Sequence, residues 1–261
     1  MAVRGRLVEV FSSAQGEGPH VGASTLFVRL AGCDLRCRWC DSPHTWRPGA
    51  TCRIETAPGS GAFRELPNPV AVADVVAAAE ALGVDRHAFV SITGGEPLLQ
   101  PEVVRALAEA LRGRGPRILL ETGGHLPEAL AEVVDGIDVV SMDWKPASEV
   151  RREGEPLAVL AEPGRSFQAL HERFLRVARR APEVIVKIVV SAATPDEELK
   201  AAFDAVAAVD PAMPLVLQPV TPHGGAQRPA AARLLALQRA AGERLADVRV
   251  IPQTHPVYGA P

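Results

Sequence analysis

The sequence of 261 residues lacks the features of membrane, secreted and nucleic-acid-binding proteins. No apolar run approaches the ~20 residues that a membrane-spanning helix needs. The first residues, Met1–Arg6, have no apolar core of the kind that a signal peptide carries. The formal net charge of −3 gives no global attraction to nucleic acid or to an anionic membrane. We therefore expect a cytoplasmic protein that binds neither.

Cysteine is also scarce, with four in the whole chain, and three of these are clustered. Cys33, Cys37 and Cys40 follow the spacing C-x3-C-x2-C. We do not expect disulfides, because the three are too close together and the chain has no secretory signature. The fourth, Cys52, falls in a Pro/Gly-rich stretch and is predicted to be a loop cysteine.

Three thiolates from one tight loop can hold three irons of a 4Fe–4S cluster. The fourth iron would then stay open, so that it could bind a small molecule and pass it an electron. A structural zinc site is the alternative, with His44 or Cys52 as the fourth ligand. The spacing of the cysteines does not decide between the two.

Apolar runs and helical patterns alternate along the chain, which is typical of βαβ units and a parallel sheet. The predicted strands are Leu7–Phe11, Thr25–Leu30, Ala88–Ile92, Arg117–Leu120, Val139–Met142, Val184–Val190 and Leu215–Leu217. The predicted helices are Val70–Leu82, Pro101–Arg112, Leu126–Val134, Ser166–Arg180, Pro195–Val209 and Pro229–Leu245. Because the chain is short for a complete (β/α)8 barrel, we predict an α/β fold: a partial, open (β/α) barrel of about six mostly parallel strands.

Two stretches interrupt this alternation, near residues 47–69 and 147–164. Both are rich in Pro and Gly and are predicted to be irregular loops. Neither demands a domain boundary, and we find no internal repeat. A single domain spanning residues 1–261 is the simplest prediction.

Polar residues follow four of the predicted strands, where barrel-like α/β folds gather their chemistry. These segments are Thr93-Gly-Gly-Glu-Pro97, Glu121–Gly124, Ser141–Lys145 and Gln218–Thr221. Two glycines would let a ligand approach the backbone, and Glu96 could accept hydrogen bonds from a ligand ammonium group. Each segment alone is equally typical of a turn or a helix cap.

The cysteine loop together with Thr93-Gly-Gly-Glu-Pro97 resembles the radical SAM superfamily. The resemblance implies that the open iron is chelated by the amino and carboxylate groups of S-adenosylmethionine (SAM), whose methionine end contacts the Gly-Gly-Glu-Pro segment. A zinc site gives no reason for this second motif, so the resemblance favours the cluster.

A narrower resemblance rests on Phe11–Gly18, Gly22, Phe27–Cys33, Trp39–Ser42 and Gln253–His255. These segments are similar to the 7-carboxy-7-deazaguanine synthase family of queuosine and deazapurine biosynthesis. The resemblance implies a carbon–nitrogen lyase that converts 6-carboxy-5,6,7,8-tetrahydropterin to 7-carboxy-7-deazaguanine. The implied reaction starts with one-electron cleavage of SAM and hydrogen removal from C6 of the pterin. It ends in ring contraction with loss of ammonia.

The resemblance also implies a role for individual residues. The implied substrate contacts are Ala14, Gln15, Gly16, Arg29, Thr93, His255 and Pro261. The implied SAM contacts are Trp39, Cys40, Asp41, Gly95, Glu96, Ser141, Met142, Asp143, Gln218, Pro219, Val220 and Thr221. The implied metal ligands are Cys33, Cys37 and Cys40 for one 4Fe–4S cluster, and Ser42 for Mg2+.

The family further implies a homodimer and an electron donor such as a flavodoxin or a ferredoxin. Two alternatives stay open at this point. A glycyl-radical-activating enzyme of the same superfamily shares the cysteine spacing but acts on a protein. A zinc-stabilised module that binds RNA or a protein partner would contain zinc and no iron.

Overall fold

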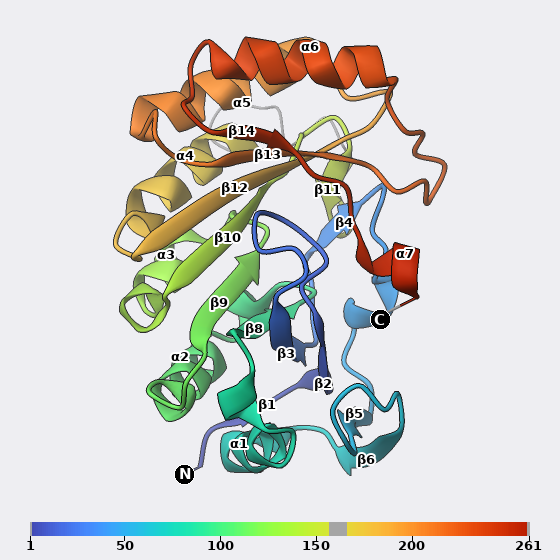
Figure 1. The fold of residues 1–261 in the computed structure, drawn as a ribbon, viewed down its shortest axis with the longest axis vertical. Coiled ribbons are helices and arrows are strands. Elements are labelled where there is room, and N and C mark those ends of the chain that lie inside the picture. The colour runs from blue at the N-terminus through green and yellow to red at the C-terminus, as the bar shows by residue number, and fades with distance from the viewer. Residues whose placement is uncertain (1, 157–165, 260–261) are drawn as a thin grey trace.

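The apolar runs form a central sheet covered by helices in the computed structural model, which describes residues 2–156 and 166–259 (Figure 1). The strands are β1 (Arg4–Gly5), β2 (Leu7–Ala14), β3 (Ser24–Leu30), β4 (Leu35–Cys37), β5 (Thr51–Glu55), β6 (Phe63–Pro67), β7 (Val70–Ala71), β8 (Phe89–Gly94), β9 (Arg117–Thr122), β10 (Val139–Trp144), β11 (Val150–Arg152), β12 (Glu183–Val190), β13 (Leu215–Pro219) and β14 (Val248–Val250). The helices are α1 (Val72–Ala81), α2 (Pro101–Leu111), α3 (Pro127–Ala131), α4 (Phe167–Ala178), α5 (Asp196–Val209), α6 (Ala231–Gly242) and α7 (His255–Tyr258).

The main sheet has ten strands in the order β14-β13-β12-β10-β9-β8-β3-β2-β5-β6. Neighbours from β3 to β14 pair in parallel, whereas β2 runs antiparallel to β3. The two edge strands, β14 and β6, each pair with one neighbour, so the sheet is open. The predicted α/β class with a mostly parallel open sheet is confirmed.

Both faces of the parallel strands are covered, as the continuous apolar runs predicted. The last six residues of β12 are all buried. Figure 1 shows α2 to α6 on the outer side of the fanned strands, and β4, β11 and α7 on the other side. In α2, Pro101 occupies the first turn, where its missing N–H costs no helical hydrogen bond. The carboxyl ends of the parallel strands and the cysteine loop line one cavity.

The prediction of an irregular loop at residues 47–69 is wrong for two segments. Thr51–Glu55 and Phe63–Pro67 form a hairpin, and its first strand pairs in parallel with β2. Cys52 lies within this hairpin and is 1% exposed in the main core. It is therefore a core residue and not a loop cysteine.

The predicted loop at 147–164 also contains a strand, although residues 157–164 lie outside the described residues. In β11, Val150 pairs with Cys37, and Arg152 pairs with Leu35. The N–H of Glu153 extends this ladder by donating to the Asp34 carbonyl at 2.8 Å. A segment more than a hundred residues away in sequence thus holds the cysteine loop by backbone hydrogen bonds.

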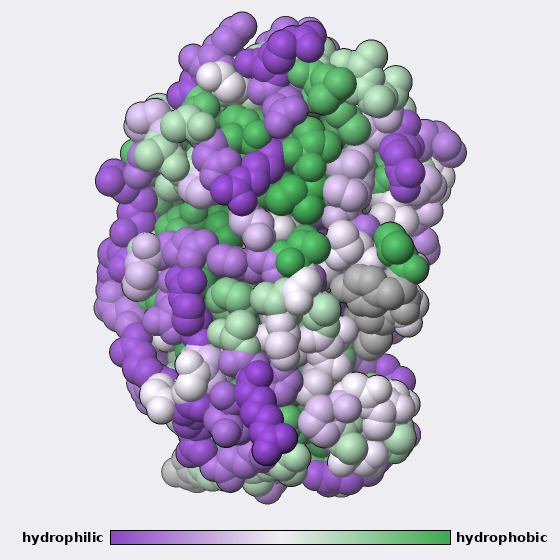
Figure 2. Space-filling model, in the orientation of Figure 1, coloured by the Kyte–Doolittle hydropathy of each residue, from purple (hydrophilic) through white to green (hydrophobic). Residues whose placement is uncertain are grey.

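The outer surface is mixed in polarity. Figure 2 shows hydrophilic residues along the left and lower margins of one face, over α1 to α4, and hydrophobic residues mainly in its upper half. Within residues 2–156 and 166–259, no helix is both long enough and apolar enough to cross a membrane.

Candidate active site

A cavity of about 480 Å³ lies where the carboxyl ends of the parallel strands meet the cysteine loop. It brings together most of the residues that the family resemblance had marked. Those on its wall are Ala14, Gln15, Gly16, Arg29, Cys33, Cys37, Trp39, Cys40, Asp41, Ser42, Thr93, Gly95, Glu96, Ser141, Asp143, Gln218, Val220, Thr221 and His255.

Two marked residues of the described part of the chain are not on this wall. Met142 is fully buried in the main core, because it alternates along β10 with Ser141 and Asp143, which line the cavity. Pro219 is buried at the end of β13 and does not line the cavity. Pro261 lies outside the described residues.

The three clustered cysteines are free thiols on the cavity wall. Burial raises the pKa of the Cys33 thiol to about 12 and that of Cys37 to about 11. In the described part of the chain, no three His, Cys, Asp or Glu side chains converge to hold a single metal ion. A 4Fe–4S cluster needs no such convergence, since each thiolate binds a different iron. Three soft thiols spread along one loop therefore suit a cluster, whose assembly would release their protons.

The turn after β8 packs directly against the cysteine loop. The Gly95 N–H donates to the Leu30 carbonyl at 3.2 Å, and the Glu96 N–H donates to the Gly32 carbonyl at 2.8 Å. A β-carbon on Gly95 would lie 2.4 Å from the Gly32 oxygen and 2.8 Å from Cβ of Cys33. Only glycine permits this approach, which fixes Glu96 relative to the first cysteine.

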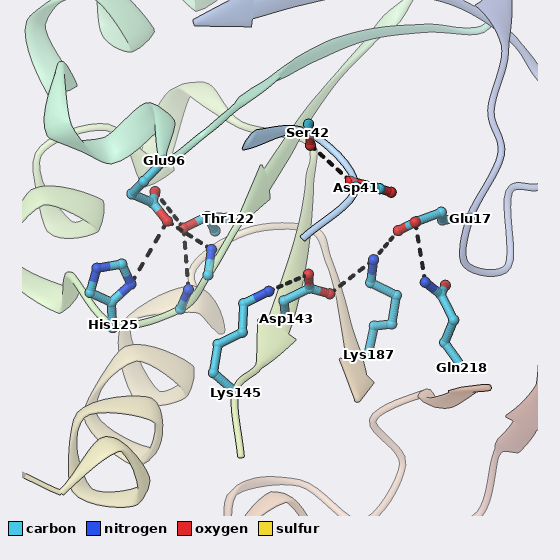
Figure 3. Close-up of polar contacts among 12 residues, drawn as sticks. Glu17, Asp41, Ser42, Glu96, Thr122, His125, Asp143, Lys145, Lys187 and Gln218 are labelled. Atoms are coloured by element: carbon cyan, nitrogen blue, oxygen red, sulfur yellow. Dashed lines mark hydrogen bonds and ion pairs between the residues drawn. The ribbon is translucent and has the colours of Figure 1, made fainter. Parts of the chain in front are cut away.

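Glu96 is 1% exposed and is held through both carboxylate oxygens (Figure 3). Oε1 accepts hydrogen bonds from the Leu98 N–H at 3.0 Å and from the Thr122 hydroxyl at 2.8 Å, and Oε2 accepts from the Gly123 N–H at 2.8 Å. A carboxylate has about four acceptor positions. Glu96 thus keeps capacity for one more donor, such as a ligand ammonium group.

A chain of buried and half-buried charges crosses the strand ends beside the cysteine loop (Figure 3). Lys145 Nζ donates to Asp143 Oδ2 at 2.8 Å, and Lys187 forms ion pairs with Asp143 and Glu17. Glu17 Oε1 also accepts from Gln218 Nε2 at 3.1 Å. Burial alone would lower the pKa of both lysines, but the neighbouring carboxylates outweigh it and raise both. Two ammonium groups and two carboxylates therefore neutralise one another inside the cavity.

Gln15 is oriented by a buried carboxyl group. Its Nε2 donates to Glu121 Oε1 at 3.0 Å, and the Ser91 hydroxyl donates to the same oxygen at 2.5 Å. Burial raises the pKa of Glu121, and these hydrogen bonds only partly oppose that effect. The arrangement holds the Gln15 amide in one orientation at the cavity wall.

Two guanidinium groups share one buried carboxylate on the cavity wall. Arg29 Nε donates to Glu9 Oε1 at 2.9 Å, Arg53 from the β5–β6 hairpin donates to Glu9 Oε2, and all three residues line the cavity. Glu9 is 2% exposed. Because one negative charge faces two positive charges, this wall keeps one positive charge that suits an anionic ligand group.

The C-terminal segment closes the rim of the cavity. The Thr254 N–H donates to the Gly16 carbonyl at 2.9 Å, and Gln253 Nε2 contacts Glu17 Oε1 at 2.6 Å and Asp41 Oδ2 at 2.8 Å. A β-carbon on Gly16 would lie 2.6 Å from the His255 ring. The segment joins Gln15–Glu17 to the end of the cysteine loop.

Sequence reasoning missed several buried or cavity-lining residues of this region, among them Glu9, Arg53, His125 and Lys187. Lys187 carried a signal, because it is the one charge inside the apolar run Val184–Val190. Glu9, Arg53 and His125 carried none, since their positions depend on contacts far apart in the sequence.

The Radical SAM superfamily model matches residues 28–206. The chain is 38% identical over 260 residues to the 7-carboxy-7-deazaguanine synthase of Geobacter sulfurreducens, covering 97% of this chain and 96% of that protein. It is 31% identical over 256 residues to the synthase of the same name from Methanocaldococcus jannaschii, covering 96% and 98%. The crystal structure of QueE from Escherichia coli shares the fold with a TM-score of 0.58 at 20% identity, covering 97% of this chain and 95% of that one.

The similarities to the two synthases extend over nearly the whole chain, and with the family match they decide against the zinc-stabilised module. A radical SAM domain uses a 4Fe–4S cluster and SAM, with electrons from a reductant. The chain belongs to the 7-carboxy-7-deazaguanine synthase family of the radical SAM superfamily.

Proposed function

We propose that this chain converts 6-carboxy-5,6,7,8-tetrahydropterin to 7-carboxy-7-deazaguanine, with loss of ammonia. The proposal rests chiefly on full-length similarity to synthases of that name. The cavity supports it, because a three-thiol loop, an anchored glutamate and a positively charged wall all face one space.

Cys33, Cys37 and Cys40 would hold the cluster through three irons. Glu96 would accept a hydrogen bond from the SAM ammonium group, and the strand ends at Ser141 and Gln218 would contact the rest of the cofactor. When bound, cluster and SAM together would supply the radical that removes hydrogen from the substrate. The protein's own part is to hold both reactants in position and to exclude water.

The substrate would lie against Gln15 and Arg29. The Gln15 amide, oriented by Glu121, suits the polar edge of a pterin ring. Arg29 belongs to the wall with excess positive charge and suits the pterin carboxylate or a ring carbonyl. The C-terminal segment at His255 would cover the bound ring.

Mg2+ would bind beside the third cysteine. The Ser42 hydroxyl donates to Asp41 Oδ1 at 2.8 Å, so two hard oxygen donors lie together on the cavity wall. Mg2+ prefers such oxygens and usually keeps several waters or substrate oxygens as further ligands. The substrate carboxylate would complete the site.

Two further proposals, a single domain and a cytoplasmic location, rest on the sequence patterns alone. A homodimer and a flavodoxin or ferredoxin as the electron donor rest on the family resemblance.

An anaerobic assay tests the function directly. The purified protein is reconstituted with iron and sulfide, reduced with a strong reductant, and given SAM, Mg2+ and the carboxytetrahydropterin. We expect about four irons per chain and a product with the mass of 7-carboxy-7-deazaguanine. A full cluster that cleaves SAM without forming this product would refute the substrate assignment.

A further inference from the structure

His125 has no part in the function described so far, yet it lies directly behind the candidate cofactor site. Its side chain is 0% exposed. It follows the turn after β9, where Gly124 has a φ of +68° and has no room for a β-carbon beside Met142. The left-handed conformation of Gly124 reverses the direction of the chain here, and the His125 ring comes to lie beside the Glu96 carboxylate.

The two ring nitrogens of His125 face two different parts of the site. Nε2 lies 2.9 Å from Asp34 Oδ1, which makes Nε2–H the donor to that carboxylate. Nδ1 faces Glu96 Oε2 at 3.8 Å, too far for a hydrogen bond, and it has no hydrogen-bond partner among the described residues. Figure 3 shows the ring facing the Glu96 carboxylate.

These two partners belong to the two motifs that carry the cofactor chemistry. Asp34 directly follows Cys33 in the cysteine loop, and Glu96 ends the Gly-Gly-Glu turn. The motifs also meet through the backbone contact of Glu96 with Gly32. His125 adds a side-chain connection between them, and its ring separates two carboxylates.

Packing alone does not explain a histidine here. The rings of His125 and Phe167 pack edge to face, with 6.2 Å between their centroids. An apolar side chain would fill the same space without leaving a buried nitrogen unpaired. We infer that His125 is a positioning residue that couples the cysteine loop to Glu96. It thereby fixes the cluster and the SAM ammonium site relative to each other.

The test compares His125→Leu with His171→Leu. His171 is a matched control, because it is equally buried and also packs against Phe167, but its ring bonds the Gly123 carbonyl and contacts neither carboxylate. For each reconstituted protein, the measurements are irons per chain, the dissociation constant for SAM, and the change that SAM causes in the EPR spectrum of the reduced cluster.

For His125→Leu we expect iron content near that of the unaltered protein, at least a tenfold rise in the SAM dissociation constant, and a weakened EPR response. His171→Leu should keep the SAM dissociation constant within about twofold. His125→Gln can restore the donor to Asp34 but not the nitrogen facing Glu96, so SAM affinity should stay low. Equal SAM affinity in His125→Leu and His171→Leu would overturn the inference, as would full recovery in His125→Gln.

A second measurement needs no cofactor. In the protein before reconstitution, Cys33 should be alkylated faster in His125→Leu than in His171→Leu, as measured by peptide mass spectrometry.

If His125→Leu does not fold, Asp34→Asn tests the same link from its more exposed end. Unchanged SAM affinity in Asp34→Asn would count against the inference. The inference rests on the proposed cluster and SAM assignments but not on the pterin. A failed pterin assay therefore leaves it standing, and a failed His125 test leaves the pterin proposal standing.

Discussion

Lys187 and Asp143 are register partners on neighbouring parallel strands, and their side chains form an ion pair with 3.0 Å between Nζ and Oδ1. Lys187 also pairs with Glu17 from the segment that precedes β3. One ammonium group thus joins a proposed SAM-binding strand end to the proposed substrate segment.

Replacing Lys187 should destabilise the protein strongly. Lys187→Met leaves Asp143 with Lys145 but deprives Glu17 of its only ion-pair partner among the described residues. Breaking a buried pair from one side costs about 3 kcal/mol or more, because a buried charge stays uncompensated. Urea unfolding of the protein without cofactors measures this loss.

Lys200→Met is the control for this measurement. Lys200 is at an exposed position of α5, so the substitution should change the unfolding free energy by less than about 0.5 kcal/mol. A similarly small effect for Lys187→Met would show that the pair is not structurally important.

His171 should make stability depend on pH. Burial lowers the pKa of His171 to about 3, whereas a histidine in the unfolded chain has a pKa of about 6.5. The unfolded state therefore takes up a proton first. The stabilising effect of neutral His171 is complete above about pH 6.5 and is lost as the pH falls toward 3, by up to about 1.4 kcal/mol per pH unit.

Urea unfolding at pH 7.5 and pH 5.0 measures this effect. The unaltered protein should lose about 2 kcal/mol more between these pH values than His171→Leu does. His223→Gln, in an exposed loop, should behave like the unaltered protein. An equal loss in His171→Leu would mean that another group controls the acid sensitivity.

Local sequence patterns were sufficient for the parallel strands from β3 to β13, but not for the short edge strand β14. Continuous apolar runs such as Val184–Val190 identify strands that are buried on both faces. The spacing of Cys33, Cys37 and Cys40, with the Gly-Gly-Glu turn, predicted a cluster loop and a strand-end site, and the structure brings these segments together at one cavity. These features depend on residues that are near one another in the sequence.

Long-range pairing explains what the sequence did not reveal. Thr51–Glu55 alternates polar and apolar residues, but the surrounding Pro and Gly hide a strand that becomes buried only through pairing with β2. Val150–Arg152 is too short to show any period and is a strand only because it pairs with the cysteine loop. Likewise, the charge of Lys187 is compensated by Glu17, 170 residues away.

The Ser42 hydroxyl should control the response to Mg2+. Ser42→Ala removes one hard oxygen donor but none of the three thiols, so Mg2+ stimulation should weaken while iron content stays the same. A Mg2+ titration of product formation, with iron analysis of the same samples, measures both. Ser42→Thr keeps the hydroxyl and should retain the response. An unchanged titration in Ser42→Ala would contradict the ligand assignment.

Arg53 should strengthen substrate binding without taking part in the reaction. It shares the carboxylate of Glu9 with Arg29, so in Arg53→Ala the whole charge of Glu9 falls on Arg29. Arg29 would then attract the pterin carboxylate less, and we expect KM for the pterin to rise roughly tenfold while kcat changes less than about threefold. Steady-state assays measure both constants.

Arg64→Ala is the matched control, because Arg64 is exposed on the other strand of the same hairpin and does not line the cavity. Binding of a pterin that lacks the carboxylate should be equal in Arg53→Ala and the unaltered protein, since the guanidinium acts on that group. A loss confined to kcat, or an equal rise of KM in Arg64→Ala, would show that the hairpin acts through folding and not through charge.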